Sequence, residues 1–179
     1  WMRLSDEQKE SKTPDKQTKD VINYLNTENE YLKQKMNHTN KLQHTLFNEI
    51  KNRIKKDDSS VPITIKDYSY YSRYEKDKEY PFHCRKLNKE NSKEEIILNV
   101  PEMAKEHAYY ALGGQSISPN QNLLAYGVDT VSRREYTLYI KDVATGTVLE
   151  DKITNTTGSA VWANDNKTIF YTKQDPITL

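Results

Sequence analysis

The sequence contains little cysteine and glycine, and no long apolar run. Its single cysteine, Cys84, excludes an intrachain disulfide and suits a reducing compartment, so we expect a cytoplasmic protein. The five glycines form no glycine-rich phosphate loop. No apolar stretch approaches the length of a membrane span, and the opening residues "WMRLSDEQKE" lack the apolar core of a signal peptide. No membrane partner is therefore expected.

An excess of charge of either sign is also missing. The chain has 27 Lys and Arg against 26 Asp and Glu, which gives a formal net charge of +1. This balance provides no electrostatic reason to expect a nucleic-acid partner. The 4 histidines lack the spacing of metal ligands, and one cysteine cannot supply a Cys pair. The sequence therefore predicts neither a metal site nor a cofactor.

Aromatic side chains, in contrast, are well represented. The 179 residues include 13 Tyr, 2 Trp and 3 Phe, although the mean hydropathy is −0.97. Disordered chains are usually poor in aromatic residues, so this composition favours a folded protein. Tyrosine suits the half-buried face of a sheet, which indicates β structure.

The first third of the chain has a helical pattern. Apolar residues recur at steps of three and four between Asp15 and Lys56, with a break at "NHTN" (37–40), and Pro62 prevents a helix from continuing. The pattern predicts either a helical hairpin or one broken long helix. We assign residues 1–60 to an N-terminal extension and interpret its apolar stripe as a packing face, not as a cofactor site.

Residues 61–179 change to short β-branched and aromatic runs separated by turn residues, which predicts strands. A strand–turn–strand–turn–strand unit occurs twice at an offset of 56 residues, so that Tyr80 corresponds to Tyr136 and Leu87 to Val143. A third copy begins at "GSAVWANDNKTIFYTKQD". Repeats of roughly 40–50 residues with four short strands are typical of propeller blades. We therefore predict a mainly β fold with an N-terminal α-helical segment, containing two blades and part of a third.

Polar turn residues support this repeat. In "DVATG" (142–146), Asp142 is placed to accept backbone N–H bonds, and Gly146 is suited to a positive φ. A propeller typically closes with about four to eight blades. Because two blades and part of a third would leave sheet edges and one blade face uncovered, we expect this chain to be a fragment of a longer protein.

Few residues suggest chemistry. "GGQSIS" resembles a nucleophile elbow, but position 118 is Ser where the motif needs Gly, and Pro119 blocks a helix. Cys84 lies in a strand-like run, which favours a small buried side chain over a reactive thiol. In "SRRE", Arg133 and Arg134 precede a strand, and a guanidinium there is suited to bind a carboxylate bidentately. The alternative is that both arginines are surface residues or paired with acidic neighbours.

Several motifs in order resemble one family. They are "WMRLSD", "VINYLNTENEYLKQKM", "YYSRYEKDKEYPFHCRK", "GGQSISPNQNLLAYGVDTVSRREYTLYIKDVATG" and "VWANDNKTIFYTKQDPITL". Together they cover nearly all 179 residues and resemble the N-terminal part of the oligopeptidase B (protease II) group within the prolyl oligopeptidase family of serine peptidases. Among these motifs, "SRREY" and "VWANDNKTIFY" are the more specific, whereas "SPNQNLLAY" is common to many propellers.

The resemblance implies an N-terminal helical extension, a seven-bladed β-propeller and a C-terminal α/β-hydrolase domain. In that family the propeller caps the active site and admits short peptides, and the oligopeptidase B group cleaves after Lys or Arg. The Ser, Asp and His of the triad lie in the hydrolase domain, so the resemblance implies no catalytic residue in this chain. Its implied partners are the hydrolase domain of the same protein and short basic peptides.

The resemblance also implies a role for the two arginines. "SRREY" corresponds to a part of the propeller that approaches the interdomain cavity. Arg133 and Arg134 are therefore candidates for binding a substrate carboxylate or for a salt bridge to the catalytic domain. An alternative function is a non-enzymatic β-propeller that binds partners on its faces, and a coiled-coil module from residues 15–56 is disfavoured because clean heptads are few.

Overall fold

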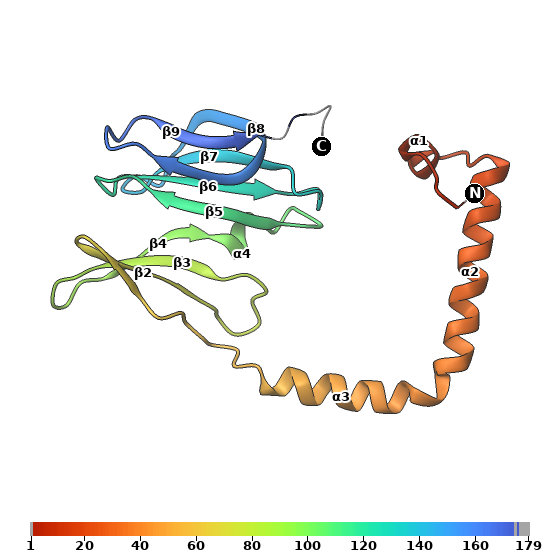
Figure 1. Cartoon of the computed structure of the whole chain (residues 1–179). Coiled ribbons are helices and arrows are strands. Elements are labelled where there is room, and N and C mark those ends of the chain that lie inside the picture. Colours follow the sequence, from red (N-terminus) through yellow and green to blue (C-terminus); the bar gives the residue numbers. More distant parts are fainter. Residues whose placement is uncertain (1, 174, 176–179) are drawn as a thin grey trace. The chain divides into compact units, whose positions relative to one another are not determined.

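The computed structural model describes residues 2–173 and 175. Its contacts divide the chain into two compact units, with the boundary between Lys55 and Lys56. The first unit is helical and the second consists of antiparallel sheets (Figure 1). Each unit is therefore described separately.

The helical unit begins with α1 (Asp6–Glu10), followed by α2 (Lys16–Met36), the 3-10 turn η1 (Asn37–Thr39) and α3 (Asn40–Arg53). Ser5 and Gln8 form a capping box on α1, and the Asp15 carboxylate accepts the Thr18 N–H at 2.7 Å at the start of α2. Figure 1 shows α2 and α3 meeting end to end at η1. The segment "NHTN" thus interrupts the helix with one tighter turn.

Most of the apolar stripe on these helices is exposed in the described chain. Val21 is buried with 2% of its surface accessible, whereas Leu32, Phe47 and Ile50 retain 59%, 59% and 61%. Among the described residues, no helix combines the length and the apolar character needed to span a bilayer. The stripe is therefore an amphipathic face of a helix rather than a continuous apolar surface.

Four strands form the first sheet in the order β1-β2-β3-β4, all antiparallel. They are β1 (Ile63–Ile65), β2 (Tyr68–Arg73), β3 (Phe82–Leu87) and β4 (Glu94–Asn99). A short helix, α4 (Val100–Met103), follows directly and is capped by the Asn99 side chain. The strands expected between Ile63 and Asn99 are present, but the run "ITIKDYSYYSRYE" reads as one strand and the structure divides it into β1 and β2 with a turn at residues 66–67.

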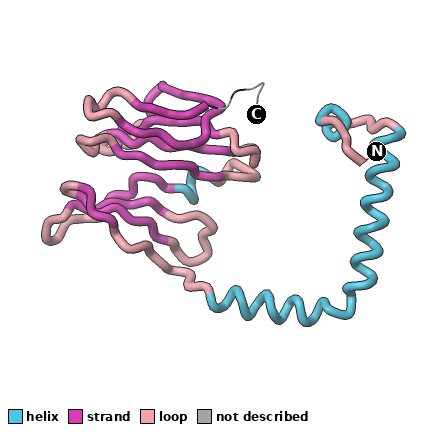
Figure 2. The backbone as a smooth tube through the Cα atoms, in the orientation of Figure 1, coloured by secondary structure: helices cyan, strands magenta, loops and turns pink. Residues whose placement is uncertain are grey.

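The second sheet has the order β5-β6-β7-β8-β9 and is also antiparallel. The strands are coloured magenta in Figure 2. Its strands are β5 (Ala111–Ile117), β6 (Leu123–Asp129), β7 (Tyr136–Asp142), β8 (Val148–Trp162) and β9 (Ile169–Lys173). β3 and β7 are the third strands of their sheets, which agrees with the repeat offset of 56 residues. The predicted turn at 142–146 is confirmed, because Asp142 accepts the Thr145 N–H at 2.8 Å and Gly146 has a φ of 75°.

Strand β8 also differs from the sequence prediction. The runs "TVLEDKI" and "GSAVW" read as two strands, but the structure joins them in the 15-residue β8. Its first half pairs with β7 and its second half pairs with β9, and the register shifts within each of these two pairings. Gly158, at a φ of 86°, lies where β8 approaches β5 and β6 so closely that a Cβ on Gly127 would be 2.4 Å from the Gly158 carbonyl oxygen. The sheet is therefore curled, and the second half of β8 packs on β5 and β6, the first two strands of the same sheet.

The core lies between the two sheets and inside this curl. One buried cluster joins β4, α4 and β6, with Leu98, Val100 and Leu124 each at most 2% accessible. A second cluster joins β6, β7 and β8 through Ala125, Leu138 and Ala160. Burial of these side chains holds the strands in register and fixes both ends of the loops between them.

Candidate functional site

The predicted residues Arg133 and Arg134 lie in the loop that joins β6 to β7. We call residues 130–135 the arginine loop. Every residue of this loop is exposed, whereas the strand residues before it, from Leu124 to Asp129, are buried. Ala111 pairs with Asp129, and Tyr136 pairs with Thr156. The start of β5 and the middle of β8 therefore lie at the end of the β6 and β7 strands from which the loop emerges. The loop therefore projects from the well-packed ends of two inner strands.

The carboxylate of Asp129 holds the first part of this loop. Its Oδ1 accepts the N–H of Val131 at 2.7 Å and of Ser132 at 3.0 Å. Its Oδ2 accepts the N–H of Arg133 at 3.1 Å and of Arg134 at 2.8 Å. Only 1% of the Asp129 surface is accessible. One buried side chain thus binds four successive backbone donors.

The charge of Asp129 is stabilised by those donors. Burial by itself would raise the pKa of this carboxyl, but the four backbone N–H groups outweigh burial and lower it from its usual range. The carboxylate is therefore ionised at neutral pH. Hydrogen bonds to a charged acceptor are also stronger than bonds between neutral groups, so the loop is held firmly.

The backbone of the loop has an unusual conformation. Ser132 and Arg134 have positive φ values of 63° and 61°. This left-handed region is uncommon for residues other than glycine and typically costs of order 1–3 kcal/mol for each residue, so it persists only where neighbouring groups impose it. The Asp129 carboxylate is the group that imposes it here.

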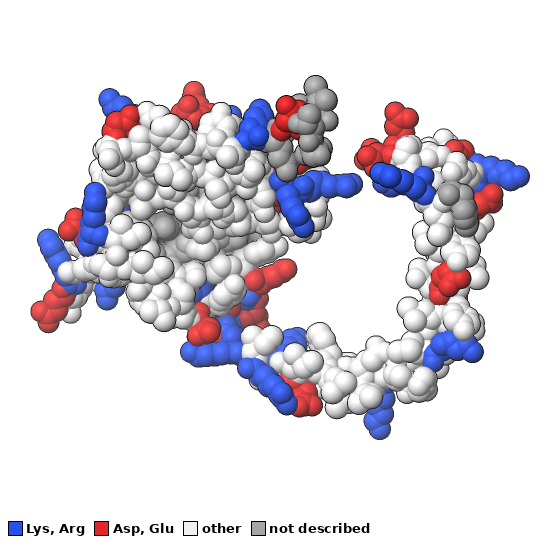
Figure 3. All heavy atoms as spheres, in the orientation of Figure 1, with Lys and Arg blue, Asp and Glu red and all other residues white. Residues whose placement is uncertain are grey.

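Tyr136 anchors the other end of the loop. Its carbonyl accepts the buried Thr156 hydroxyl at 3.0 Å, and its ring lies against Gly158, where an added Cβ would be 2.6 Å from the ring Cγ. Within residues 2–173 and 175, neither guanidinium of the arginine loop has an ion-pair partner. The two arginines are therefore exposed cations on a loop that is fixed at both ends. Figure 3 shows Lys and Arg side chains projecting from the rim of the sheet unit.

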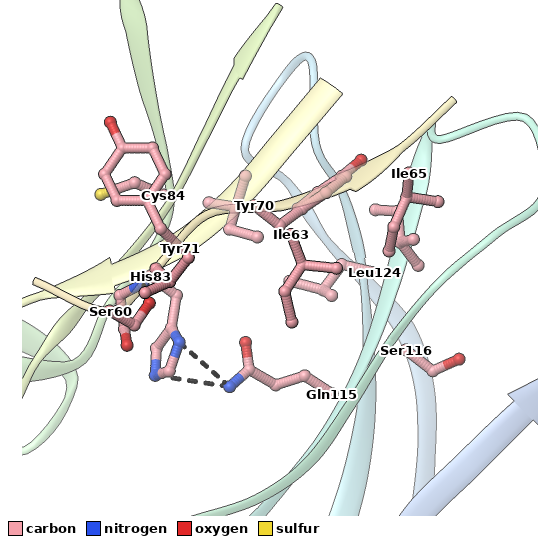
Figure 4. A pocket seen from close by; sticks show the side chains of 14 residues that line it. Ser60, Ile63, Ile65, Tyr70, Tyr71, His83, Cys84, Gln115, Ser116 and Leu124 are labelled. Atoms are coloured by element: carbon pink, nitrogen blue, oxygen red, sulfur yellow. Dashed lines mark hydrogen bonds between the residues drawn. The ribbon is translucent and has the colours of Figure 1, made fainter. Parts of the chain in front are cut away.

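A second candidate is the cavity of about 320 Å³ between the two sheets. Strands β1 to β4 line one side, and β5 and β6 line the other. Gln115 bridges the two sides by a hydrogen bond to the His83 ring at 3.2 Å (Figure 4). Burial lowers the pKa of His83, so its ring is neutral at pH 7. None of the fourteen lining residues is acidic, and neither arginine lines it. The cavity is a largely apolar gap between blades without the composition of a catalytic triad.

The remaining candidates from the sequence are also placed. Ser116 lies within β5 and not at a strand-to-helix turn, which agrees with the rejection of a nucleophile elbow. Cys84 is 1% accessible, and burial is the main reason that its pKa rises to about 11, so the buried interpretation is confirmed. The described residues contain no cluster of three metal-ligating side chains. Sequence reasoning missed Asp129, although an Asp at the end of a buried strand and before a polar loop is a signal for a capped turn.

Comparison with known proteins assigns the family. Residues 14–178 match the family described as "Prolyl oligopeptidase, N-terminal beta-propeller domain". The chain is 35% identical to dipeptidyl aminopeptidase BI of Pseudoxanthomonas mexicana and 31% identical to protease 2 of Moraxella lacunata, over 92% and 90% of its own length. Oligopeptidase B from Leishmania major has a similar structure, with a TM-score of 0.80, 30% identity and 98% of this chain covered.

The chain spans about a quarter of the length of these relatives, namely 25%, 24% and 24%. Its two antiparallel sheets and the curled β8–β9 segment correspond to part of a propeller, as the sequence repeat predicted. The chain therefore belongs to the N-terminal β-propeller domain family of the prolyl oligopeptidases.

Proposed function

We propose that the parent protein is a serine peptidase that hydrolyses short peptides after Lys or Arg, and that this chain belongs to the propeller that limits access to its catalytic site. The observation that carries the proposal is the family match over residues 14–178. The likeness to protease 2 and to an oligopeptidase B supports the finer assignment. A single cysteine, which is buried, supports a reducing, cytoplasmic location.

The proposed chemistry is acyl transfer outside this chain. A serine of a C-terminal hydrolase domain attacks the scissile carbonyl, a histidine takes and returns the proton, and backbone donors stabilise the oxyanion. The propeller packs on that domain and restricts access to the catalytic site. A short, flexible peptide can enter the site, and a folded protein cannot. The largely apolar gap between the blades, which has no acidic lining residue, supports a structural role for this unit.

Arg133 and Arg134 are the residues of this chain that we propose to touch a carboxylate. That carboxylate belongs either to the peptide substrate or to the catalytic domain. Support comes from their exposure and from a loop held at both ends by Asp129 and Tyr136. A guanidinium held in a fixed direction binds a carboxylate with less loss of conformational entropy than one on a free loop.

A second candidate is the release of dipeptides from an amino terminus. It is favoured by the 35% identity to a protein named dipeptidyl aminopeptidase BI. The two activities differ in one requirement, because removal of an amino-terminal dipeptide depends on a free α-amino group. A substrate with a blocked amino terminus therefore separates them.

The test uses the full-length parent protein and a ten-residue peptide with one internal Arg, prepared with a free and with an acetylated amino terminus. We expect mass spectrometry to find cleavage after Arg in both forms. Cleavage of the free form alone, two residues from its start, would favour the dipeptidyl activity. A peptide with Arg replaced by Ala serves as the control, and a parent protein that cleaves none of these peptides would contradict the peptidase proposal.

A further inference from the structure

The arginine loop contains a hydrogen-bond arrangement that the family assignment does not explain. Four consecutive N–H groups, from Val131 to Arg134, converge on the one carboxylate of Asp129. Two residues of this stretch occupy the left-handed region without being glycine. Backbone strain of this kind is retained where the surroundings over-determine it, and such places often have a functional role.

The loop is also joined to the core at its far end. The Tyr136 carbonyl accepts the Thr156 hydroxyl, and the Tyr136 ring rests on Gly158 of β8. Thr156 is itself 1% accessible. The backbone of Arg133 and Arg134 is therefore fixed between two buried anchors, while both side chains remain exposed.

We propose that Asp129 is a positioning residue that fixes the direction of Arg133 and Arg134 so that together they bind the carboxylate at the C-terminal end of a peptide substrate. This inference rests on the proposed function and goes beyond it by naming the group recognised and the residue that orders the site. Asp129 itself touches no substrate, because its two oxygens are occupied by the loop N–H groups. Replacing it loosens the loop and leaves the guanidinium charges in place.

A peptide carboxylate is favoured as the ligand for two reasons. Arg133 and Arg134 are consecutive in the loop, and a guanidinium matches the charge and the planar geometry of a carboxylate. In addition, no acidic residue among those described pairs with either side chain, so no described group competes for the site. Asp or Glu residues elsewhere in the parent protein are the other source of the same chemistry, and the experiment separates the two.

The first measurement does not depend on activity. Trypsin cleaves after exposed arginines only where the backbone can adapt to its active site, so a loop held by Asp129 resists cleavage. In the full-length protein, we expect Asp129→Asn to accelerate cleavage after Arg133 and Arg134 about tenfold, as expected for the loss of a hydrogen-bonded charge. Asp142→Asn is the matched control, because Asp142 caps the turn at the other end of β7. Equal cleavage rates in the two variants would overturn the proposal.

The second measurement compares a peptide that ends in a free carboxylate with the same peptide ending in an amide. In the wild-type protein, the free acid should show the lower KM. Arg133→Ala and Arg134→Ala should each raise this KM, and Asp129→Asn should raise it about tenfold, close to the value for the amide. Asp142→Asn should keep the difference between the peptides. A purely structural role of Asp129 would not selectively remove this difference.

Asp129 is buried, so its replacement can also impair folding. A second variant, with one glycine inserted after Thr130, keeps Asp129 and both arginines but shifts the N–H donors away from the carboxylate. Insertions in exposed loops are usually tolerated, so this variant should fold and reproduce both effects of Asp129→Asn. If the inserted variant keeps the wild-type preference and trypsin resistance, the positioning role is wrong.

The remaining outcomes are distinct. If the wild-type protein hydrolyses both peptides equally, the peptide carboxylate is not the ligand and the inference fails although the peptidase function stands. A loss of thermal stability in Arg133→Ala and Arg134→Ala would then assign these arginines to ion pairs inside the parent protein. If the wild-type protein hydrolyses neither peptide, the proposed function fails, and the trypsin result alone decides whether Asp129 holds the loop.

Discussion

At the scale of single residues, Arg85 joins the two sheets as a buried cation. Its side chain is 6% accessible and its Nε donates to Glu95 at 2.7 Å. Its Nη1 donates to the Gln121 carbonyl in the β5–β6 turn at 2.6 Å, and the guanidinium lies 4.2 Å from the centre of the Tyr68 ring. Glu95 is 46% accessible, so water can solvate that partner if the pair is broken.

We therefore predict unequal effects of breaking this pair from its two sides. Arg85→Ala should lower the free energy of unfolding by about 3 kcal/mol, because it leaves the Gln121 carbonyl without its donor in a buried place. Glu95→Gln should cost about 1 kcal/mol, since Arg85 keeps its other contacts. Urea unfolding of both variants measures the difference. Equal losses would contradict this account.

Cys84 allows a prediction about reactivity. Burial raises the pKa of its thiol to about 11, and only 1% of its surface is accessible. Alkylation requires the exposed thiolate, so iodoacetamide should modify the folded protein at pH 8 at least about tenfold more slowly than the protein unfolded in urea. Because Cys84 is the chain's one cysteine, the total incorporation reports this site directly. Similar rates in the folded and unfolded protein would show that the thiol is accessible.

At the scale of elements, the course of β8 depends on Gly158. Its φ of 86° allows β8 to turn from β7 toward β9, and its missing side chain leaves room for the Tyr136 ring. Gly146 also has a positive φ, of 75°, but a Cβ there would meet only the Lys141 Cε, at 4.0 Å. Both glycines therefore have a positive φ, but only Gly158 is closely packed against a neighbouring side chain.

This difference predicts the ranking of two substitutions. Gly146→Ala should cost about 1 kcal/mol, because alanine is strained at positive φ. Gly158→Ala should cost about 3 kcal/mol or more, since it adds a clash with Tyr136 inside a packed region. Thermal unfolding of the two variants, followed by circular dichroism, tests the ranking. Equal melting temperatures would mean that the Tyr136 ring moves aside without cost.

At the scale of the whole molecule, the last strands present an uncovered apolar face. Val161 of β8 and Phe170 of β9 are paired across the two strands on one face, and they keep 65% and 64% of their surface accessible. In a propeller, such a face packs against the following blade. Within the part of the chain that the structure describes, these side chains are therefore exposed, and in a complete propeller they would be buried.

The expected consequence is self-association of the isolated chain. Sedimentation velocity at roughly 50 μM should detect dimers or larger species, since contiguous exposed apolar patches drive association. Replacing Val161 and Phe170 by Lys should increase the monomer fraction. Thr64→Lys, on the exposed strand β1, is the control for each single replacement, because it adds one positive charge as Val161→Lys or Phe170→Lys does. A monomeric wild-type chain at this concentration would contradict the prediction.

The sequence by itself determined the class of fold and its repeat, because the signals for strands and turns are local. Apolar and aromatic alternation marked the strands between Ile63 and Asn99, and Asp142 and Gly146 marked a turn that the structure confirms. Two adjacent letters also suggested the arginine pair as a candidate site, which stays a prediction. The ordered motifs carried the resemblance to the family that residues 14–178 match.

Only the tertiary structure decided the course of β8 and the environment of the arginines. No local signal shows that two strand-like runs form one curved strand, since the bend at Gly158 follows from its packing against Tyr136 and Gly127. Likewise, the sequence signals a capped turn at Asp129 but does not show that four N–H groups converge on its carboxylate. Such contacts depend on the backbone dihedral angles of several residues together, which are set by burial of the surrounding core and not by the letters of the loop alone.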